Sequence, residues 1–198
     1  MNYNWRKVVF SNETTIQIFC NTLPGWSRDA KPIALMVKHL FKVHIWGAIS
    51  IKGKIGMHMF TENLDHHLYR QILDDHLYNN ANLIHGCWWV FQQDNNLKHT
   101  SRDVQGDLKT HLSGRVLPWL FYSSDLNPIE NVWAVLKKNI KKKIKSIVAQ
   151  KKSISKEIFF ELIQKKWDDL DKNVIVNCIN SMSLKIDQSD LGMWLVMQ

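Results

Sequence analysis

Residues 87–94 read Cys87-Trp88-Trp89-Val90-Phe91-Gln92-Gln93-Asp94, a short apolar run that closes on a carboxylate. Its apolar part from Trp88 to Phe91 is too short for a helix and has polar residues on both sides, so it predicts a buried β-strand at residues 88–91. Asp94 then stands at the end of that strand. An aspartate in this position is also a common turn residue, so Asp94 alone does not identify a site.

A second carboxylate follows after an interval of 35 residues, in the segment Ser123-Ser124-Asp125-Leu126-Asn127-Pro128-Ile129-Glu130-Asn131-Val132-Trp133. Asn127 followed by Pro128 is typical of a helix N-cap and first helical position, so a long helix should begin here. Glu130 then lies in the first turn, where a carboxylate also complements the helix dipole. One carboxylate at a strand end and one at a helix start are oxygen ligands of the kind that hold Mg²⁺ in two-metal phosphoryl-transfer sites.

The remaining elements follow from hydrophobic periodicity and from turn residues. Strands are expected at residues 8–10, 15–19, 42–50 and 55–60, the last two as a hairpin, with a brief strand at 116–117 and a loop at 21–33. Helices are expected from 64 to about 79–80, from 104 to 112, from 128 onward, and as one last helical region from 158 to 182. Strands first, then alternating strands and helices, then helices predict an α/β layered domain.

The composition describes one globular domain with a basic surface. The chain has 198 residues, 45% of them hydrophobic, a net charge of +8 and a pI of about 9.4. That charge suggests a polyanionic partner, although an ordinary basic soluble protein fits it equally well. The sequence has no run of about 20 apolar residues that could cross a membrane and no apolar signal-peptide core at its N-terminus. Its three isolated cysteines predict no disulfide framework.

Both acidic segments resemble the catalytic core of Tc/mariner-type DDE transposases, whose acidic triad is Asp, Asp, Glu. The likeness rests on Gln92-Gln93-Asp94-Asn95, on Lys98-His99-Thr100, and on the 123–133 segment quoted above. It extends from about Trp5 to Met182 and implies a ribonuclease H-like α/β fold, a mixed central sheet flanked by helices. Residues 1–150 would form the catalytic-type domain, and residues 151–198 a C-terminal helical extension packed on it. Asp94 and Glu130 match the family's second and third catalytic, metal-binding positions.

The resemblance also implies a function. Members of this family cut DNA at element ends by metal-assisted hydrolysis and join the freed 3′-hydroxyl to target DNA, the reactions of DNA transposition and DNA integration. We therefore expect Mg²⁺ or Mn²⁺ as the cofactor, DNA as the partner, a nuclear location and no membrane association, and a homodimer stays open. The family also carries an N-terminal helix-turn-helix module that reads the element ends. We expect this chain to lack that module and its DNA contacts to be mostly non-specific.

Asn12 occupies the family's first acidic position, in the segment Lys7-Val8-Val9-Phe10-Ser11-Asn12-Glu13. An amide offers one neutral oxygen where a carboxylate offers an anionic and bridging one. The lost attraction to a divalent ion is of the order of several kcal/mol, so we expect metal binding to be weakened or absent and activity to be impaired. Glu13 cannot simply substitute, because successive strand residues point to opposite faces. Whether the chain is an enzyme stays open, and the alternative is a catalytically inactive, domesticated DNA-binding or oligomerisation module.

Positive charge collects on the helix that begins near Glu130. Between residues 137 and 156 the chain has nine lysines and no acidic residue. A solvated helix face is the ordinary explanation, and a surface that follows DNA phosphates fits equally well. Because lysines reach phosphates rather than base edges, such contacts would be non-specific. The candidate DNA-binding residues are Lys137, Lys138, Lys141, Lys142, Lys143 and Lys145 on the helix, with Lys98 and His99 just beyond Asp94.

Overall fold

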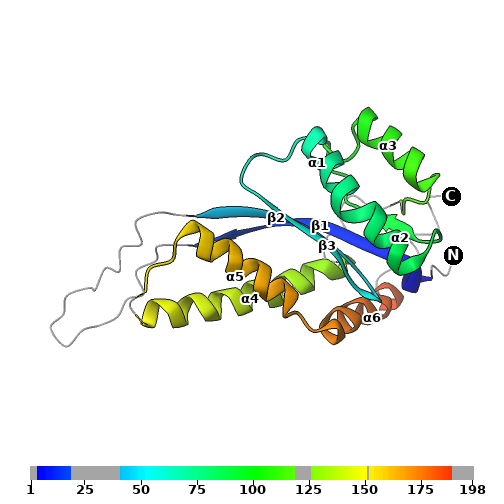
Figure 1. The fold of residues 1–198 in the computed structure, drawn as a ribbon. Coiled ribbons are helices and arrows are strands. Elements are labelled where there is room, and N and C mark those ends of the chain that lie inside the picture. Colours follow the sequence, from blue (N-terminus) through cyan, green and yellow to red (C-terminus); the bar gives the residue numbers. More distant parts are fainter. Residues whose placement is uncertain (1–3, 19–40, 119–125, 151, 189–198) are drawn as a thin grey trace.

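A four-stranded mixed sheet forms the centre of the fold, in the order β3-β2-β1-β4 (Figure 1). The computed structural model describes residues 4–18, 41–118, 126–150 and 152–188, so the loop expected at 21–33 lies outside the described residues. β1 pairs antiparallel with β2, β2 pairs antiparallel with β3, and β4 runs parallel to β1. The mixed sheet and the β2–β3 hairpin are those that the sequence predicted. The strands are β1 (Val8–Gln17), β2 (Lys42–Ser50), β3 (Gly53–Phe60) and β4 (Val90–Gln92).

β1 is one continuous strand, and the prediction of two short strands was wrong. It pairs with β2 along its whole length, with Asn12 opposite Gly47. Backbone hydrogen bonds to β2 carry the strand through its polar middle. The polar side chains that interrupt the hydrophobic pattern, Ser11, Asn12 and Glu13, each contact a residue from another element. The interruption therefore marks a cluster of polar contacts rather than a turn.

Helices cover both faces of the sheet (Figure 1). On one face α1 (His66–Leu73), the π-helical segment η2 (Asp74–Tyr78), α2 (Asn79–His85) and α3 (Arg102–Leu112) share a core with the sheet. On the other face α4 (Pro128–Ala149), α5 (Lys156–Asp168) and α6 (Lys172–Gln188) enclose a second core. A 3₁₀ turn, η1 (Trp5–Lys7), precedes β1. Because strand side chains alternate between faces, neighbouring residues of β1 face different sets of helices.

The helical stretch after β3 continues to His85, beyond the end predicted at residues 79–80. Asn80 does not end it, because its side-chain amide donates to the carbonyl of His76 at 3.1 Å and satisfies that group inside the helix. The wide turn of η2 packs tightly on β3: a Cβ at Gly56 would stand 2.3 Å from the carbonyl oxygen of His76. Only glycine permits so close an approach of helix backbone to strand.

β4 begins two residues later than the predicted strand. Trp88 is 74% exposed, whereas Trp89 is fully buried, and its indole N–H donates to Asn82 at 2.8 Å. The brief strand expected at 116–117 is reduced to a single parallel bridge between Val116 and Phe91. The strand that precedes Asp94 is therefore short, and Asp94 lies two residues past its end.

α4 begins where the sequence predicted, with Asn127 as its N-cap. Its inner face is buried as expected, including Ile129, Val132 and Leu136. Trp133 fills the space above Gly47, where a Cβ would stand 2.5 Å from Cη2 of the indole. Since Glu130 lies one turn before Trp133, the seating of this indole on β2 sets the position of the Glu130 carboxylate.

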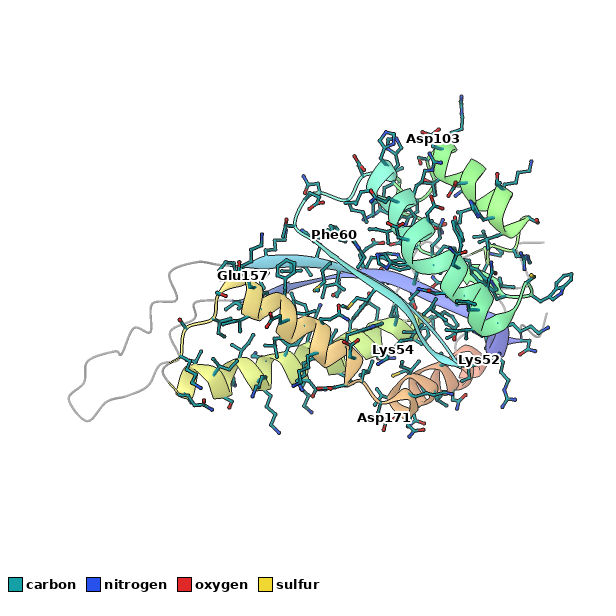
Figure 2. The ribbon with its side chains drawn as sticks, in the orientation of Figure 1. Lys52, Lys54, Phe60, Asp103, Glu157 and Asp171 are labelled. Carbon is teal, nitrogen blue, oxygen red and sulfur yellow. The ribbon has the colours of Figure 1, made fainter. Side chains whose placement is uncertain are left out.

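The last helical region is two helices, not one, with the break at residues 169–171. Lys54 of β3 stabilises the end of α5: its ammonium donates to the carbonyls of Trp167 and Asp168 at 3.0 and 2.7 Å, beside the turn that holds Asp171 (Figure 2). Lysine on the last carbonyls of a helix is a favourable C-terminal contact. Each helix within the described ranges falls short of the length or the apolar character needed to cross a lipid bilayer.

Candidate active site

Asn12 and Glu130 meet between β1 and the first turn of α4. The side-chain amide of Asn12 donates to Oε1 of Glu130 at 2.6 Å, across 118 positions of sequence. The amide oxygen of Asn12 accepts from the backbone N–H of Glu13 at 2.7 Å. Both ends of the amide are therefore engaged, and its nitrogen side faces the carboxylate. The amide donates a hydrogen bond to Glu130. A carboxylate at position 12 would instead repel Glu130 unless a cation lay between the two groups.

Asn127 fastens the start of α4 to two strands. Besides accepting from the N–H of Ile129, its side chain donates to the carbonyl of Ser11 at 3.0 Å and to Oε1 of Gln92 at 3.1 Å. Asn127 is 2% exposed, so these hydrogen bonds form in the protein interior. The residue that the sequence identified as a helix cap also joins β1 and β4 to α4, next to the Asn12–Glu130 contact.

Asp94 belongs to a second group of charged side chains, with Glu13, Lys98 and His99. Nδ1 of His99 is hydrogen-bonded to Oδ1 of Asp94, and its Nε2 lies 3.2 Å from Oε1 of Glu13. The ammonium of Lys98 lies 3.0 Å from Oε2 of Glu13. Glu13 therefore points to the opposite face of β1 from Asn12, as the alternation of strand side chains predicts. The two carboxylates are balanced by two cationic groups.

The electrostatics of these groups follow from burial and from their partners. Burial raises the pKa of Glu130, the Lys137 charge and the Asn12 hydrogen bond oppose that rise, and the charge of Asp94 adds to it. Burial is the largest single influence on Asp94 and raises its pKa, but the hydrogen bond and charge of His99, the Asn96 N–H and the Lys98 charge together lower that pKa below its ordinary value. Burial alone would lower the pKa of His99, yet its contacts with Asp94 and Glu13 raise it to about 9. Asp94 is thus close enough to Glu130 for their charges to interact.

The structure corrects the expectation that His99 contacts a phosphate. His99 is 1% exposed and both ring nitrogens face carboxylates, so it has no free donor at the surface. Lys98 is partly buried and paired with Glu13. The six candidate lysines of α4 are all exposed and lie along the outer side of the helix: Lys137, Lys138, Lys141, Lys142, Lys143 and Lys145.

Asp94 and Glu130 supply carboxylate oxygens, the type of donor that Mg²⁺ takes in proteins. Oδ1 of Asp94 accepts from His99 and from the N–H of Asn96, and Oε1 of Glu130 accepts from Asn12. A second ion would need a bridging anion from β1, and Asn12 instead presents an N–H donor.

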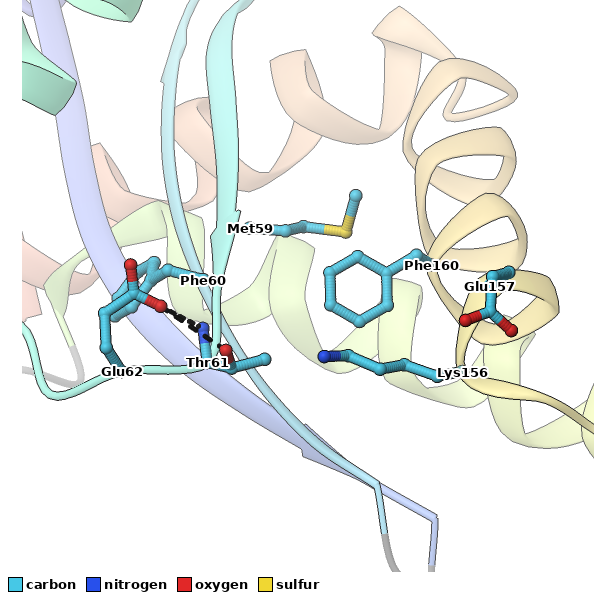
Figure 3. A pocket seen from close by; sticks show the side chains of 7 residues that line it. All are labelled: Met59, Phe60, Thr61, Glu62, Lys156, Glu157 and Phe160. Carbon is cyan, nitrogen blue, oxygen red and sulfur yellow. Dashed lines mark hydrogen bonds between the residues drawn. The ribbon is translucent and has the colours of Figure 1, made fainter.

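Two other features of the described residues are separate from this site. A hollow of about 440 Å³ lies between the end of β3 and the start of α5, lined by Met59, Phe60, Thr61, Glu62, Lys156, Glu157 and Phe160 (Figure 3). The ammonium of Lys156 lies 5.6 Å from the ring centre of Phe160. None of the site residues lines this hollow. Asp74, Asp107 and His111 form a further group, but Asp107 already contacts Arg70 and the hydroxyl of Tyr78.

Sequence reasoning missed the role of Glu13 and the second role of Asn127. Glu13 was set aside because it faces away from Asn12, and that very orientation brings it to His99. Tyr69 was given no role at the site, yet its ring stacks on His99 with ring centres 4.1 Å apart and its hydroxyl donates to Gln93 at 2.8 Å. The available signal was chemical: a polar Glu13 in a strand and a tyrosine in a helix core both require polar partners.

These elements define a ribonuclease H-like domain, a mixed sheet with helices on both faces and polar side chains gathered where β1, β4 and the start of α4 meet. The Mos1 transposase in its paired-end complex with the left transposon end has the same fold, with a TM-score of 0.69, 21% identity, and coverage of 90% of this chain and 53% of that chain. The Mos1 mariner paired-end complex with Mn gives a TM-score of 0.64 at 19% identity, over 91% of this chain and 53% of that chain.

The chain belongs to the DDE superfamily endonuclease family, whose model matches residues 7–151. It is 28% identical over 188 residues to the transposable element Tcb2 transposase of Caenorhabditis briggsae, and 28% identical over 197 residues to the Tcb1 transposase of the same organism. Each alignment covers 90% of this chain and 65% of the relative, so the chain spans just under two thirds of the length of these proteins.

Proposed function

We propose that this chain is the DNA-cutting and DNA-joining domain of a Tc/mariner-type transposase, with its metal-dependent chemistry impaired by Asn12. Membership of the DDE superfamily endonuclease family supports the reaction class, and the transposase relatives support DNA as the substrate. The observation that carries the impairment is the 2.6 Å hydrogen bond from the Asn12 amide to Glu130. A hydrogen-bond donor therefore occupies the position where metal-dependent DNA cleavage requires an anionic metal ligand.

Asp94 and Glu130 are the residues that would hold a divalent ion, Mg²⁺ or Mn²⁺. The solved Mos1 complex with Mn supports a divalent ion for this fold. When bound, such an ion supplies Lewis-acid polarisation of the phosphodiester and a water of lowered pKa. The chain's own contribution is to hold the two carboxylates: Asp94 through His99 and the Asn96 N–H, and Glu130 through the first turn of α4.

Asn12 acts on Glu130 in two ways. First, its side chain is neutral, so position 12 lacks the negative charge that would bridge two ions. Second, its amide engages one carboxylate oxygen of Glu130 in a charge-assisted hydrogen bond. Any ion must therefore compete with this hydrogen bond for Glu130. Both effects lower metal affinity, so Asn12 impairs the site without disturbing the fold around it.

DNA would be bound through phosphates, along the exposed lysines of α4. These lysines begin at Lys137, whose charge already acts on Glu130, so the basic surface extends outward from the candidate site. The paired-end complexes of Mos1 support an arrangement in which two copies act together, and a nuclear location follows from a DNA substrate. A catalytically inactive DNA-binding module is the second candidate function, favoured by the same Asn12 amide together with the intact lysine surface.

A cleavage assay with matched variants tests the proposal. Duplex DNA is incubated with Mn²⁺ or Mg²⁺ and the unmodified chain, which should show negligible nicking. Asn12→Asp restores the third carboxylate and should produce metal-dependent nicking, and adding Asp94→Ala to that variant should abolish it. Robust cleavage by the unmodified chain would contradict the impairment. Cleavage that survives Asp94→Ala would contradict the site, and a repaired variant that binds DNA without any nicking would favour the inactive module.

A further inference from the structure

His99 forms a group with Glu13 and Asp94, and one ligand-type atom from each of the three residues lies within 4.8 Å of the other two. Its imidazole is 1% exposed and lies between two carboxylates of different elements, Asp94 beyond β4 and Glu13 on β1. The ring therefore connects the loop that carries Asp94 to the central strand of the sheet. Lys98 holds the other oxygen of Glu13 at 3.0 Å, so Glu13 is itself fixed from two sides.

The ring and backbone of His99 are held in place by three further contacts. Tyr69 of α1 stacks on the imidazole, with ring centres 4.1 Å apart and planes inclined by 28°. The His99 carbonyl accepts from Gln105 of α3 at 2.8 Å and from Gln93 at 3.4 Å. A side chain fixed by helices α1 and α3 has little rotational freedom, so the direction of its Nδ1–H is set by the fold.

We propose that His99 is a positioning residue for Asp94: its Nδ1–H holds Oδ1 and thereby turns the second oxygen, Oδ2, toward the metal. Glu13 fixes the imidazole from the opposite side. The inference rests on the proposed function, because it assigns Asp94 as a metal ligand. Hydrogen bonds that orient ligating carboxylates are a general feature of metal sites, and removing such a partner typically costs about 10–100-fold in metal affinity.

A purely structural role for this network is less well supported. A buried group of balanced charges is weak evidence for stability, since desolvation offsets most of the attraction. The network also ends on Asp94, whose side chain is 41% exposed. A contact that leads from the interior to a partly open carboxylate is suited to directing that carboxylate.

Two substitutions separate positioning from packing. Asn at position 99 places an amide N–H near the former Nδ1 and keeps the donor to Asp94, whereas Gln places its N–H near the former Nε2, the nitrogen that lies 3.2 Å from Glu13. Both remove the ring that stacks on Tyr69. His99→Asn and His99→Gln are made in the full chain carrying Asn12→Asp, where Mn²⁺ affinity is expected to be higher, and Mn²⁺ binding is measured by calorimetry together with the melting temperature.

The expected result is a split between affinity and stability. His99→Gln should bind Mn²⁺ about 10–100-fold more weakly than the parent, His99→Asn should stay close to the parent, and both should lose similar thermal stability. Equal Mn²⁺ affinity in His99→Gln and the parent, with binding lost in Asp94→Ala, would overturn the positioning role and leave the proposed function intact. Unchanged binding in Asp94→Ala would instead overturn the metal site and the inference with it.

A spectroscopic readout covers the case in which the His99 variants do not fold. In the unmodified chain the Nδ1 proton of His99 should give a resonance shifted far downfield by its hydrogen bond to a carboxylate. That resonance should vanish in Asp94→Ala, which removes the acceptor, and persist in Glu13→Gln, which changes only the contact of the other nitrogen. Its absence from the unmodified chain, or its survival in Asp94→Ala, would overturn the assignment of Asp94 as the partner of His99.

Discussion

At the scale of single residues, the side-chain amide of Asn12 changes which partners Glu130 can bind. Oxygen and nitrogen of its amide take opposite partners, the N–H of Glu13 and the carboxylate of Glu130. An aspartate at this position would place a second carboxylate beside Glu130. Two carboxylates so close together repel each other unless a cation or a proton lies between them. The amide makes the contact stable without either.

Asn12→Asp should make the stability of the fold depend on metal. Without divalent ions the variant should lose about 1.5–3 kcal/mol of unfolding free energy, because it loses a hydrogen bond to a charged group. Mn²⁺ should recover that loss with the logarithm of its concentration once it exceeds the Kd, whereas the unmodified chain should respond weakly. Denaturant titrations with and without Mn²⁺ measure both. A variant with metal-independent stability equal to that of the unmodified chain would show that the amide contact contributes nothing.

At the scale of elements, the site depends on how closely helices approach the sheet. Gly47 on β2 and Gly56 on β3 are places where a Cβ would collide, with the Trp133 indole in one case and the backbone of η2 in the other. The first contact seats α4, and with it Glu130. The second brings η2 against β3, where Nδ1 of His58 lies 3.0 Å from Nε2 of His76.

Gly47→Ala should destabilise the fold by displacing Trp133. Overpacking of this kind costs about 1–3 kcal/mol, and the shift should carry Glu130 away from Asn12. Trp133→Phe removes the ring atoms that would collide, so the double variant should recover part of the loss, with a coupling energy of at least about 0.5 kcal/mol. Gly106→Ala in α3 is the control, because nothing lies within 4 Å of its added Cβ. Additive losses in the double variant would contradict the seating of α4 on Gly47.

The His58–His76 contact predicts a stability that falls in mild acid. Burial lowers the pKa of His58 from its ordinary value of 6.5, and His76 lowers it further. The unfolded chain then binds a proton more readily than the folded one, so this contribution is fully present above pH 6.5 and is lost as pH falls toward the folded pKa. Unfolding free energies measured between about pH 5 and 8 should show a shallower fall in His58→Gln than in the unmodified chain. Parallel curves would exclude His58 as a source.

At the scale of the whole molecule, a net charge of +8 is distributed unevenly. Lysines crowd the outer side of α4, while on the far face of the sheet Asp74 and Asp107 lie with His111. Carboxylates near the site are each held by donors from other elements, as Glu130 is by Asn12. The positive charge is therefore free to act on a polyanion, and the α4 surface is where it is concentrated.

Replacing Lys141, Lys142 and Lys143 with Gln should weaken DNA binding in a salt-dependent way. Each phosphate contact contributes a slope of about −0.9 to the plot of log affinity against log salt, so the slope should flatten by roughly two to three units. Lys7→Gln, Lys109→Gln and Lys172→Gln together remove the same charge from other exposed positions and serve as the control. Equal slopes for the two triple variants would mean that only net charge matters.

Local sequence pattern was sufficient for most elements and for the family, and its assignment of Asp94 and Glu130 as site residues stays a prediction. The cap and proline at Asn127-Pro128 located the start of α4, the alternation of β1 placed Glu13 opposite Asn12, and the motif strings around Asp94 and Glu130 pointed to the family. These signals lie within a few residues of one another. Asn12 was identified as the departure for the same reason, because its neighbours match the family's first strand.

Tertiary structure alone decided what those residues touch. The Asn12–Glu130 and Asn127–Ser11 hydrogen bonds join positions 118 and 116 residues apart, and no periodicity encodes such pairs. β1 was predicted as two strands because its middle residues are polar. The pairing with β2 that keeps these residues in one strand cannot be read from the sequence of β1 itself. His99 was predicted among the DNA-binding residues because it lies just past Asp94, but Tyr69, Glu13 and Asp94 surround it. A polar side chain can be buried wherever distant elements supply its partners, and only the folded chain brings those elements together.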